Sequence, residues 1–160
     1  MKANVHTIHH YEDEPELLRW IPGVLFNRFW SRFPQWVQDE GAYEEHDETR
    51  TTFALEQDAT KHVIEYRLYK RLDDFNRQFA ENAKVADVAL IDVMDKGNRP
   101  NGLAVYRDVV KKLRPQNVYL LTSFPSTVTI SVPEGHILAK PVDATTLADL
   151  LIECLGIGPA

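Results

Sequence analysis

Carboxylate, hydroxyl and ammonium side chains stand at the ends of four segments that are predicted to be strands. Crowded carboxylates bind either a proton or a hard cation, and Mg²⁺ prefers oxygen ligands and leaves room for a phosphoryl group. An ammonium and a hydroxyl can neutralise further phosphoryl oxygens, and a carboxylate can act as the nucleophile. The groups in question are Glu12, Asp13 and Glu14, then Asp92, then Thr122 with Ser123, and lastly Lys140.

Phosphoryl transfer onto Asp92 is the chemistry that these residue types serve best. Asp92 closes the nearly continuous apolar run 85–91, so a buried strand would deliver one carboxylate to the sheet edge. The charge of a phosphoryl group on that carboxylate needs three partners, which Mg²⁺, Lys140 and the Thr122 hydroxyl can supply.

The C-terminal half alternates between strand and helix patterns. Short β-branched runs separated by amphipathic segments predict parallel strands with helices packed on both faces. Because parallel strands end at the same edge of a sheet, the four groups should converge there. The predicted strands are 85–92, 117–123 and 135–141, and the predicted helices are 102–115 and 143–156, the last capped by Asp143 and Gly156.

The N-terminal half predicts one more unit and a less regular middle. Residues 4–15 can contain a strand, with Val5 and Ile8 as its apolar members, and 15–20 can open a helix that Pro22 should kink or interrupt. An acidic segment, 39–48, is typical of a solvated loop. Alternating residues predict a hairpin of 49–56 and 61–69, followed by a short helix at 72–83.

Composition excludes several classes of protein. The 160 residues carry a net charge of −6, which argues against a direct nucleic-acid interface. The single cysteine, Cys154, excludes an internal disulfide and a cysteine-based zinc site, and it fits a reducing compartment. No apolar run is long enough for a membrane span and no signal peptide is recognisable, so the expected location is the cytoplasm.

The sequence resembles the receiver domain of bacterial two-component response regulators. The matching motifs are "YEDEP" at 11–15, "VALIDVM" at 88–94 followed by Gly102, "YLLTS" at 119–123 and "LAKP" at 138–141, and they occur in the family's order. This resemblance implies an α/β fold with a doubly wound, five-stranded parallel sheet of the flavodoxin-like type. It implies a single receiver-like domain over 1–160, with an insertion at approximately 31–61.

The resemblance also assigns roles to individual residues. Asp92 would be the phospho-acceptor, Thr122 the switch hydroxyl and Lys140 the conserved-type lysine, with a cis peptide between Lys140 and Pro141. Mg²⁺ would be bound by Glu12, Asp13, Asp92 and the backbone carbonyl of Met94, with Glu12 acting through water. The implied partners are a sensor histidine kinase or phosphotransfer protein and an unknown downstream protein. A homodimer is compatible with the resemblance and is not decided by it.

Several departures from the receiver pattern are visible. Glu12 stands where the family prefers Asp, and the loop from Asp92 to Gly102 is long and contains Asp95 and Lys96. Residues 123–137 are β-branched and contain two prolines, so they predict a degenerate fourth helix. Ile137 stands where the family often has an aromatic switch residue.

Three functions are therefore compared. The preferred hypothesis is a stand-alone phospho-accepting receiver, with no enzymatic activity beyond its own phosphoryl transfer and aspartyl-phosphate hydrolysis. The second is a receiver-like interaction module that no longer switches, which the long loop, Ile137 and the degenerate helix favour. The third is a Mg²⁺-dependent phosphohydrolase, ranked last because no substrate-binding cap or general acid is evident.

Overall fold

The computed structural model describes residues 2–13, 19–37, 42–82, 86–94 and 99–157. One sheet of seven strands forms its centre, in the order β2-β3-β4-β1-β5-β6-β7. The strands are β1 (Lys2–Tyr11), β2 (Tyr43–Glu45), β3 (Arg50–Gln57), β4 (Thr60–Tyr69), β5 (Ala86–Asp92), β6 (Val118–Thr122) and β7 (Ile137–Ala139), and the α-helices are α1 (Ile21–Arg32), α2 (Leu72–Asn82), α3 (Asn101–Val109) and α4 (Ala144–Leu155).

Five neighbouring strands of this sheet are parallel. Their order, β4-β1-β5-β6-β7, is that of a flavodoxin-like doubly wound sheet, in which the second strand lies outside the first. The predicted fold class is thereby confirmed. β2 and β3 add two antiparallel strands beyond β4, so the complete sheet is wider than the predicted five strands.

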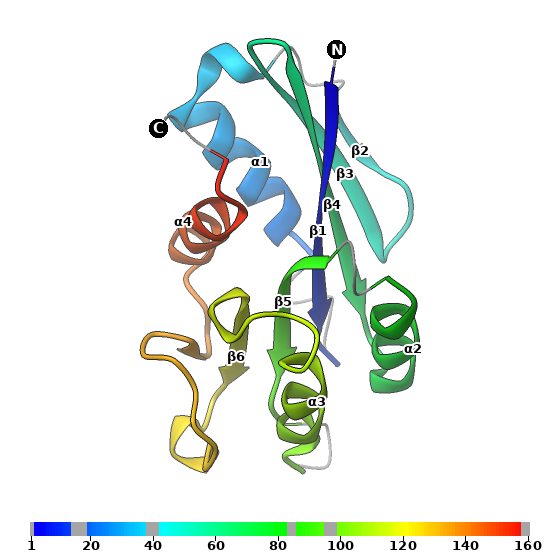
Figure 1. Cartoon of the computed structure of the whole chain (residues 1–160). Coiled ribbons are helices and arrows are strands. Elements are labelled where there is room, and N and C mark those ends of the chain that lie inside the picture. The colour runs from blue at the N-terminus through cyan, green and yellow to red at the C-terminus, as the bar shows by residue number, and fades with distance from the viewer. Residues whose placement is uncertain (1, 14–18, 38–41, 83–85, 95–98, 158–160) are drawn as a thin grey trace.

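Helices cover both faces of the sheet. α1 and α4 pack on one face and α2 and α3 on the other, where each pair buries its own apolar cluster (Figure 1). On the α1 face, Phe26 lies 5.3 Å between ring centroids from both Tyr43 of β2 and Phe53 of β3. Through these aromatic contacts, β2 and β3 pack against the core on the α1 face.

The hairpin of β3 and β4 is present as predicted. Gln57 pairs with Thr60 across a two-residue turn in which Asp58 has φ of 53°, a left-handed conformation that Asp tolerates. β4 has a partner on each edge, because it pairs antiparallel with β3 and in parallel with the whole of β1. Burial alternates along most of β4, and Ile64 and Tyr66 belong to the core under α1.

The helix predicted to open at 15–20 can be compared only at its last two residues, 19 and 20, which form a turn. Residues 14–18 lie outside the described part of the chain, and α1 begins at Ile21. Pro22 consequently occupies the first turn, where its missing N–H costs nothing, and it does not kink the helix. α3 ends at Val109, earlier than the predicted 115, although Leu113 N–H still bonds to the Val109 carbonyl.

The connection from β6 to β7 is fully described and contains no α-helix. A single 3-10 turn at Pro125–Thr127 stands where a doubly wound fold would place a helix, as the prolines and β-branched residues predict. α4 begins and ends as predicted, because Asp143 accepts a hydrogen bond from Thr146 N–H and Gly156 takes a left-handed φ of 66°. Among the described residues, no helix is long and apolar enough to cross a membrane.

Candidate functional site

Strand register brings the four predicted groups to one edge of the sheet. Tyr11 pairs with Ile91, so Glu12 and Asp92 follow neighbouring strands at the same level. Asp92 pairs with Leu121 on β6, and Thr122 pairs with Ala139 on β7, the residue before Lys140. The Lys140 N–H donates to the Thr122 carbonyl at 2.9 Å, and the Lys140–Pro141 peptide is cis, as the resemblance implied.

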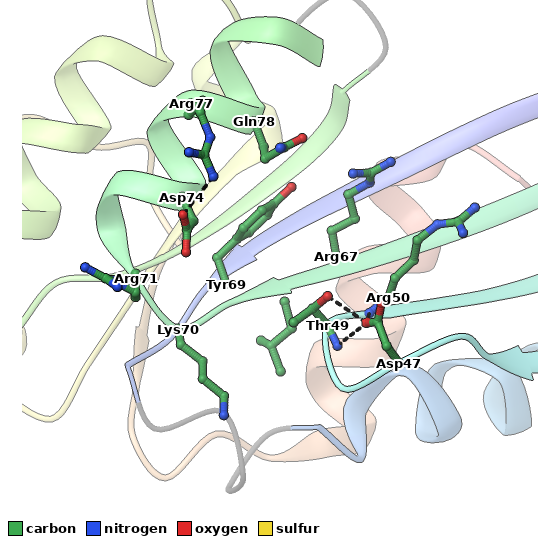
Figure 2. A pocket seen from close by; sticks show the side chains of 11 residues that line it. Asp47, Thr49, Arg50, Arg67, Tyr69, Lys70, Arg71, Asp74, Arg77 and Gln78 are labelled. Atoms are coloured by element: carbon green, nitrogen blue, oxygen red, sulfur yellow. Dashed lines mark hydrogen bonds and ion pairs between the residues drawn. The ribbon is translucent and has the colours of Figure 1, made fainter.

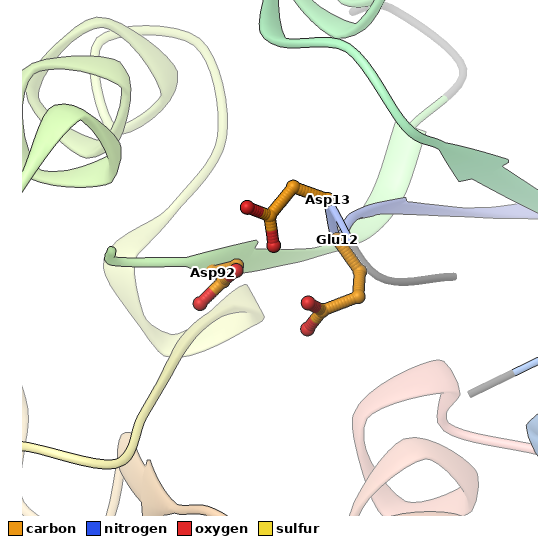
Figure 3. A group of neighbouring side chains, drawn as sticks. All are labelled: Glu12, Asp13 and Asp92. Carbon is orange, nitrogen blue, oxygen red and sulfur yellow. The ribbon is translucent and has the colours of Figure 1, made fainter. Parts of the chain in front are cut away.

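Three carboxylates meet at this edge (Figure 3). One oxygen from each of Glu12, Asp13 and Asp92 lies within 4.8 Å of the others. The Glu12 and Asp92 residues are 2% and 3% exposed, while Asp13 is half-buried on the outer side. Two buried carboxylates and a third beside them form a strongly negative centre that calls for a cation.

Lys140 supplies one positive charge to this centre. Its Nζ donates to Glu12 Oε2 at 2.6 Å and lies 3.0 Å from Asp92 Oδ1. Burial alone would lower the pKa of Lys140, but the hydrogen bond and charge of Glu12, and the charge of Asp92, hold that pKa above its ordinary value. The lysine therefore stays protonated while it bridges the two buried acids.

One ammonium does not balance three carboxylates. Burial, followed by the charge of Glu12, raises the pKa of Asp92 from 3.8 to about 8, although Lys140 opposes this shift. Asp92 consequently holds a proton at neutral pH when no other cation is bound. A second cation beside the three oxygens would lower that pKa and free the carboxylate for attack.

The Thr122 hydroxyl is buried at the next strand end and is already engaged. Its Oγ1 accepts a hydrogen bond from the Phe124 backbone N–H at 3.0 Å, and the Phe124 side chain is 53% exposed. Ser123 is exposed and Met94 is half-buried two residues beyond Asp92. Glu14, Asp95 and Lys96 lie outside the described residues.

A buried histidine and tyrosine lie close to the acids, which sequence reasoning missed. His10 Nδ1 and the Tyr66 hydroxyl are 2.7 Å apart, and both residues are fully enclosed. Burial, and then the charge of Lys140, lower the pKa of His10 to about 3, so the ring is neutral. The pairing of β1 with β4 creates this contact, and no local sequence pattern signals it.

The histidines of "HTIHH" hold no metal cluster within the described residues. His9 Nδ1 lies 2.9 Å from the Tyr69 hydroxyl, and His6 Nε2 lies 3.0 Å from His62 Nδ1. The one acid or histidine cluster with metal-binding geometry in the part of the chain that the structure describes is the carboxylate group above.

Gly102 fixes the start of α3 against the strand that carries Asp92. Its N–H donates to the Val93 carbonyl at 3.0 Å, and a Cβ placed on it would meet the Asp92 carbonyl oxygen at 2.2 Å. We expect Gly102→Ala to lower the free energy of unfolding by about 3 kcal/mol, because backbone on both sides must move. Urea unfolding followed by circular dichroism measures this change.

Gly23→Ala is the matched control for that substitution. Gly23 lies inside α1, where an added Cβ meets only the Tyr43 hydroxyl at an ordinary 3.5 Å. This control should raise stability by about 0.5–1 kcal/mol, the usual gain of Ala over Gly in a helix. Equal effects of the two substitutions would contradict the close approach at Gly102.

Comparison with known proteins finds a likeness to solved structures but none in sequence. No protein-family model matches the chain, and no curated protein matches its sequence. Among solved structures, it is similar to the receiver domain from the hybrid histidine kinase CckA, with 18% identity, a TM-score of 0.48, and coverage of 93% of this chain and 98% of that chain. The fold assignment rests on the strand order and not on this likeness.

Proposed function

We propose that this chain is a phospho-accepting receiver of two-component signalling, with Asp92 as the acceptor. One observation carries the proposal: Lys140 bridges Asp92 and Glu12 at the sheet edge where Asp13 adds a third carboxylate. The motifs that resemble a receiver supply these residues in order, from the ends of β1, β5 and β7. Apart from its own phosphorylation and hydrolysis, we expect no enzymatic turnover.

Mg²⁺ is the cation that fits this donor set. All the side-chain ligands are carboxylate oxygens, which suit a hard cation, and no sulfur or imidazole belongs to the cluster among the described residues. Glu12, Asp13 and Asp92 would hold it, with the Met94 carbonyl as the proposed fourth protein ligand. When bound, Mg²⁺ would neutralise one phosphoryl oxygen.

The chain's own groups perform the transfer. An Asp92 carboxylate oxygen attacks the phosphorus of a phosphohistidine, the new O–P bond forms and the N–P bond breaks. The leaving imidazole nitrogen keeps the bonding electron pair and takes up a proton. Lys140, 3.0 Å from Asp92 before the reaction, is placed to neutralise a second phosphoryl oxygen.

Thr122 offers a route from the site to the surface. If its hydroxyl turns to bond the phosphoryl group, the hydrogen bond from Phe124 N–H is lost and the exposed aromatic ring is released. Ile137 is half-buried and offers no aromatic ring for this purpose. The donor would be a histidine kinase or phosphotransfer protein in the cytoplasm, and the output a changed contact with a partner or a second copy of the chain.

The proposal is tested by treating the protein with acetyl phosphate in the presence of Mg²⁺ or of EDTA. We expect intact-mass spectrometry to show one added phosphoryl group only with Mg²⁺, and peptide mapping to place it on Asp92. Beryllofluoride should occupy the same site under the same conditions. No adduct at all would favour a module that does not switch, while continuous release of phosphate from small esters would favour a phosphohydrolase.

A further inference from the structure

A basic pocket lies away from the carboxylate site, between the ends of β3 and β4 and the first turns of α2 (Figure 2). Its volume is about 460 Å³. The chain has a net charge of −6, yet five cationic side chains line this one pocket. These five residues are Arg50, Arg67, Lys70, Arg71 and Arg77, and we call the cavity they line the arginine pocket.

Two of these arginines stand directly opposite each other. Arg50 of β3 pairs with Arg67 of β4 in the antiparallel ladder, where like charges repel. Glu65 lies between them, and both Nε atoms bond the same oxygen of its carboxylate. One carboxylate thus serves two guanidinium groups, and Arg67 also bonds the side chain of Tyr69. Each arginine has five N–H donors, so these bonds do not use them all.

The acids around the pocket are already engaged. Asp47 Oδ1 accepts hydrogen bonds from the N–H and hydroxyl of Thr49 and from Arg50 N–H, which closes the turn before β3. Asp74 lies 2.9 Å from Arg77, and Glu48 lies 3.5 Å from Lys70. With Glu65, these acids make four carboxylates around the five cationic side chains of the pocket. The pocket therefore has a local excess of positive charge, although the net charge of the protein is negative.

We propose that the arginine pocket binds a small organic phosphate. Guanidinium groups present paired, planar N–H donors that match phosphate oxygens, and the volume is that of a typical small-molecule site. Tyr69 of the strand, whose hydroxyl lies 2.9 Å from His9 Nδ1, and Gln78 of the helix also line the pocket. The carboxylate site, by contrast, repels an anion that arrives without a metal.

One backbone hydrogen bond connects the lining of the pocket to the carboxylate site. The Glu12 N–H donates to the Tyr69 carbonyl at 2.9 Å, and Tyr69 lines the pocket. A ligand in the pocket would therefore contact β4 at Tyr69, the residue whose carbonyl is bonded to Glu12 N–H. This second site goes beyond the proposed function, and it can exist whether or not Asp92 is phosphorylated.

The test measures binding of inorganic pyrophosphate and of adenosine monophosphate by calorimetry and by NMR of backbone amides. Both titrations use the Asp92→Asn protein in EDTA, so that phosphate at the acceptor site makes no contribution. We expect at least one probe to bind, to shift the amides of Arg67, Tyr69 and Arg77, and to weaken as NaCl is raised. Arg77→Gln and Arg67→Lys should each weaken binding about fivefold to tenfold.

Arg107→Gln is the matched control, since Arg107 is exposed on α3 and lies outside the pocket. It should leave binding unchanged. Arg77 is itself 64% exposed at its side chain, so its substitution should not disturb folding. Absence of binding by both probes, equal loss in the control, or binding only of a polyglutamate peptide would overturn the proposal.

Discussion

Asp92→Asn is expected to abolish phosphorylation by acetyl phosphate and, in the same protein, to raise the free energy of unfolding at pH 8 by about 2 kcal/mol. The amide has no nucleophilic carboxylate oxygen, so the phosphoryl adduct should be lost completely. The amide also removes one of two buried acids that share a single ammonium, although its oxygen can still accept from Lys140. Mass spectrometry and urea unfolding in EDTA measure the two effects.

The gain in stability has a defined pH dependence. The pKa of Asp92 is raised from 3.8 to about 8 in the folded state, mainly by burial and then by Glu12. The folded protein therefore binds more protons than the unfolded chain between about pH 4 and pH 8. Stability from this group is complete below pH 4 and is lost as the pH rises through 8, so the advantage of Asn should grow over this range.

Mg²⁺ should stabilise the wild type more than Asp92→Asn. A ligand at 100 times its dissociation constant stabilises a folded protein by about 2.7 kcal/mol, and the wild type should show this gain at pH 8. Asp92→Asn should lose most of it, because one carboxylate ligand is gone. Asp108→Asn, at an exposed position on α3, is the control and should change neither phosphorylation nor the response to Mg²⁺. A phosphoryl adduct retained by Asp92→Asn would contradict the assignment of the acceptor.

Much of the carboxylate site was predictable because it depends on the ends of strands. Short, β-branched, almost continuously apolar runs identify parallel strands, and their carboxyl ends must meet at one edge. That reasoning brings Glu12, Asp92 and Lys140 together without knowledge of any distance. The alternation of 49–56 and 61–69 likewise predicted the hairpin of β3 and β4.

The remaining features depend on pairing between distant segments, which local patterns do not contain. His10 meets Tyr66 only because β1 pairs with β4 in one particular register. The arginine pocket needs the register of β3 on β4, which sets Arg50 opposite Arg67, and the placement of α2 beside them. Pro22 was misleading for another reason: the same residue that breaks a helix interior is well tolerated in a first turn.

Lys140→Met should be the most destabilising substitution at the site, with a loss of about 3–5 kcal/mol at pH 8 in EDTA. Methionine keeps much of the volume of the lysine side chain but removes the ammonium that Glu12 and Asp92 share. Both carboxylate residues are at most 3% exposed, so water cannot replace the lost partner. The Glu12 charge then loses its buried ammonium, and the pKa of Asp92, already about 8 with Lys140 in place, is raised further. Urea unfolding across a series of pH values measures the effect.

The cause of this loss can be separated from poor packing by two forms of rescue. As the pH falls from about 9.5 to 7, Asp92 takes up its proton and the difference between Lys140→Met and the wild type should shrink. Lys140 opposes the raised pKa of that carboxyl, so the folded variant holds the proton to a higher pH than the folded wild type. Mg²⁺ at pH 8 should also restore stability, since it supplies the missing positive charge. Lys111→Met, which removes a 74% exposed lysine paired with Asp108, should change stability by less than about 0.5 kcal/mol. A large loss that neither this fall in pH nor Mg²⁺ restores would show that Lys140 acts through packing, and would remove the electrostatic basis for its role beside Asp92.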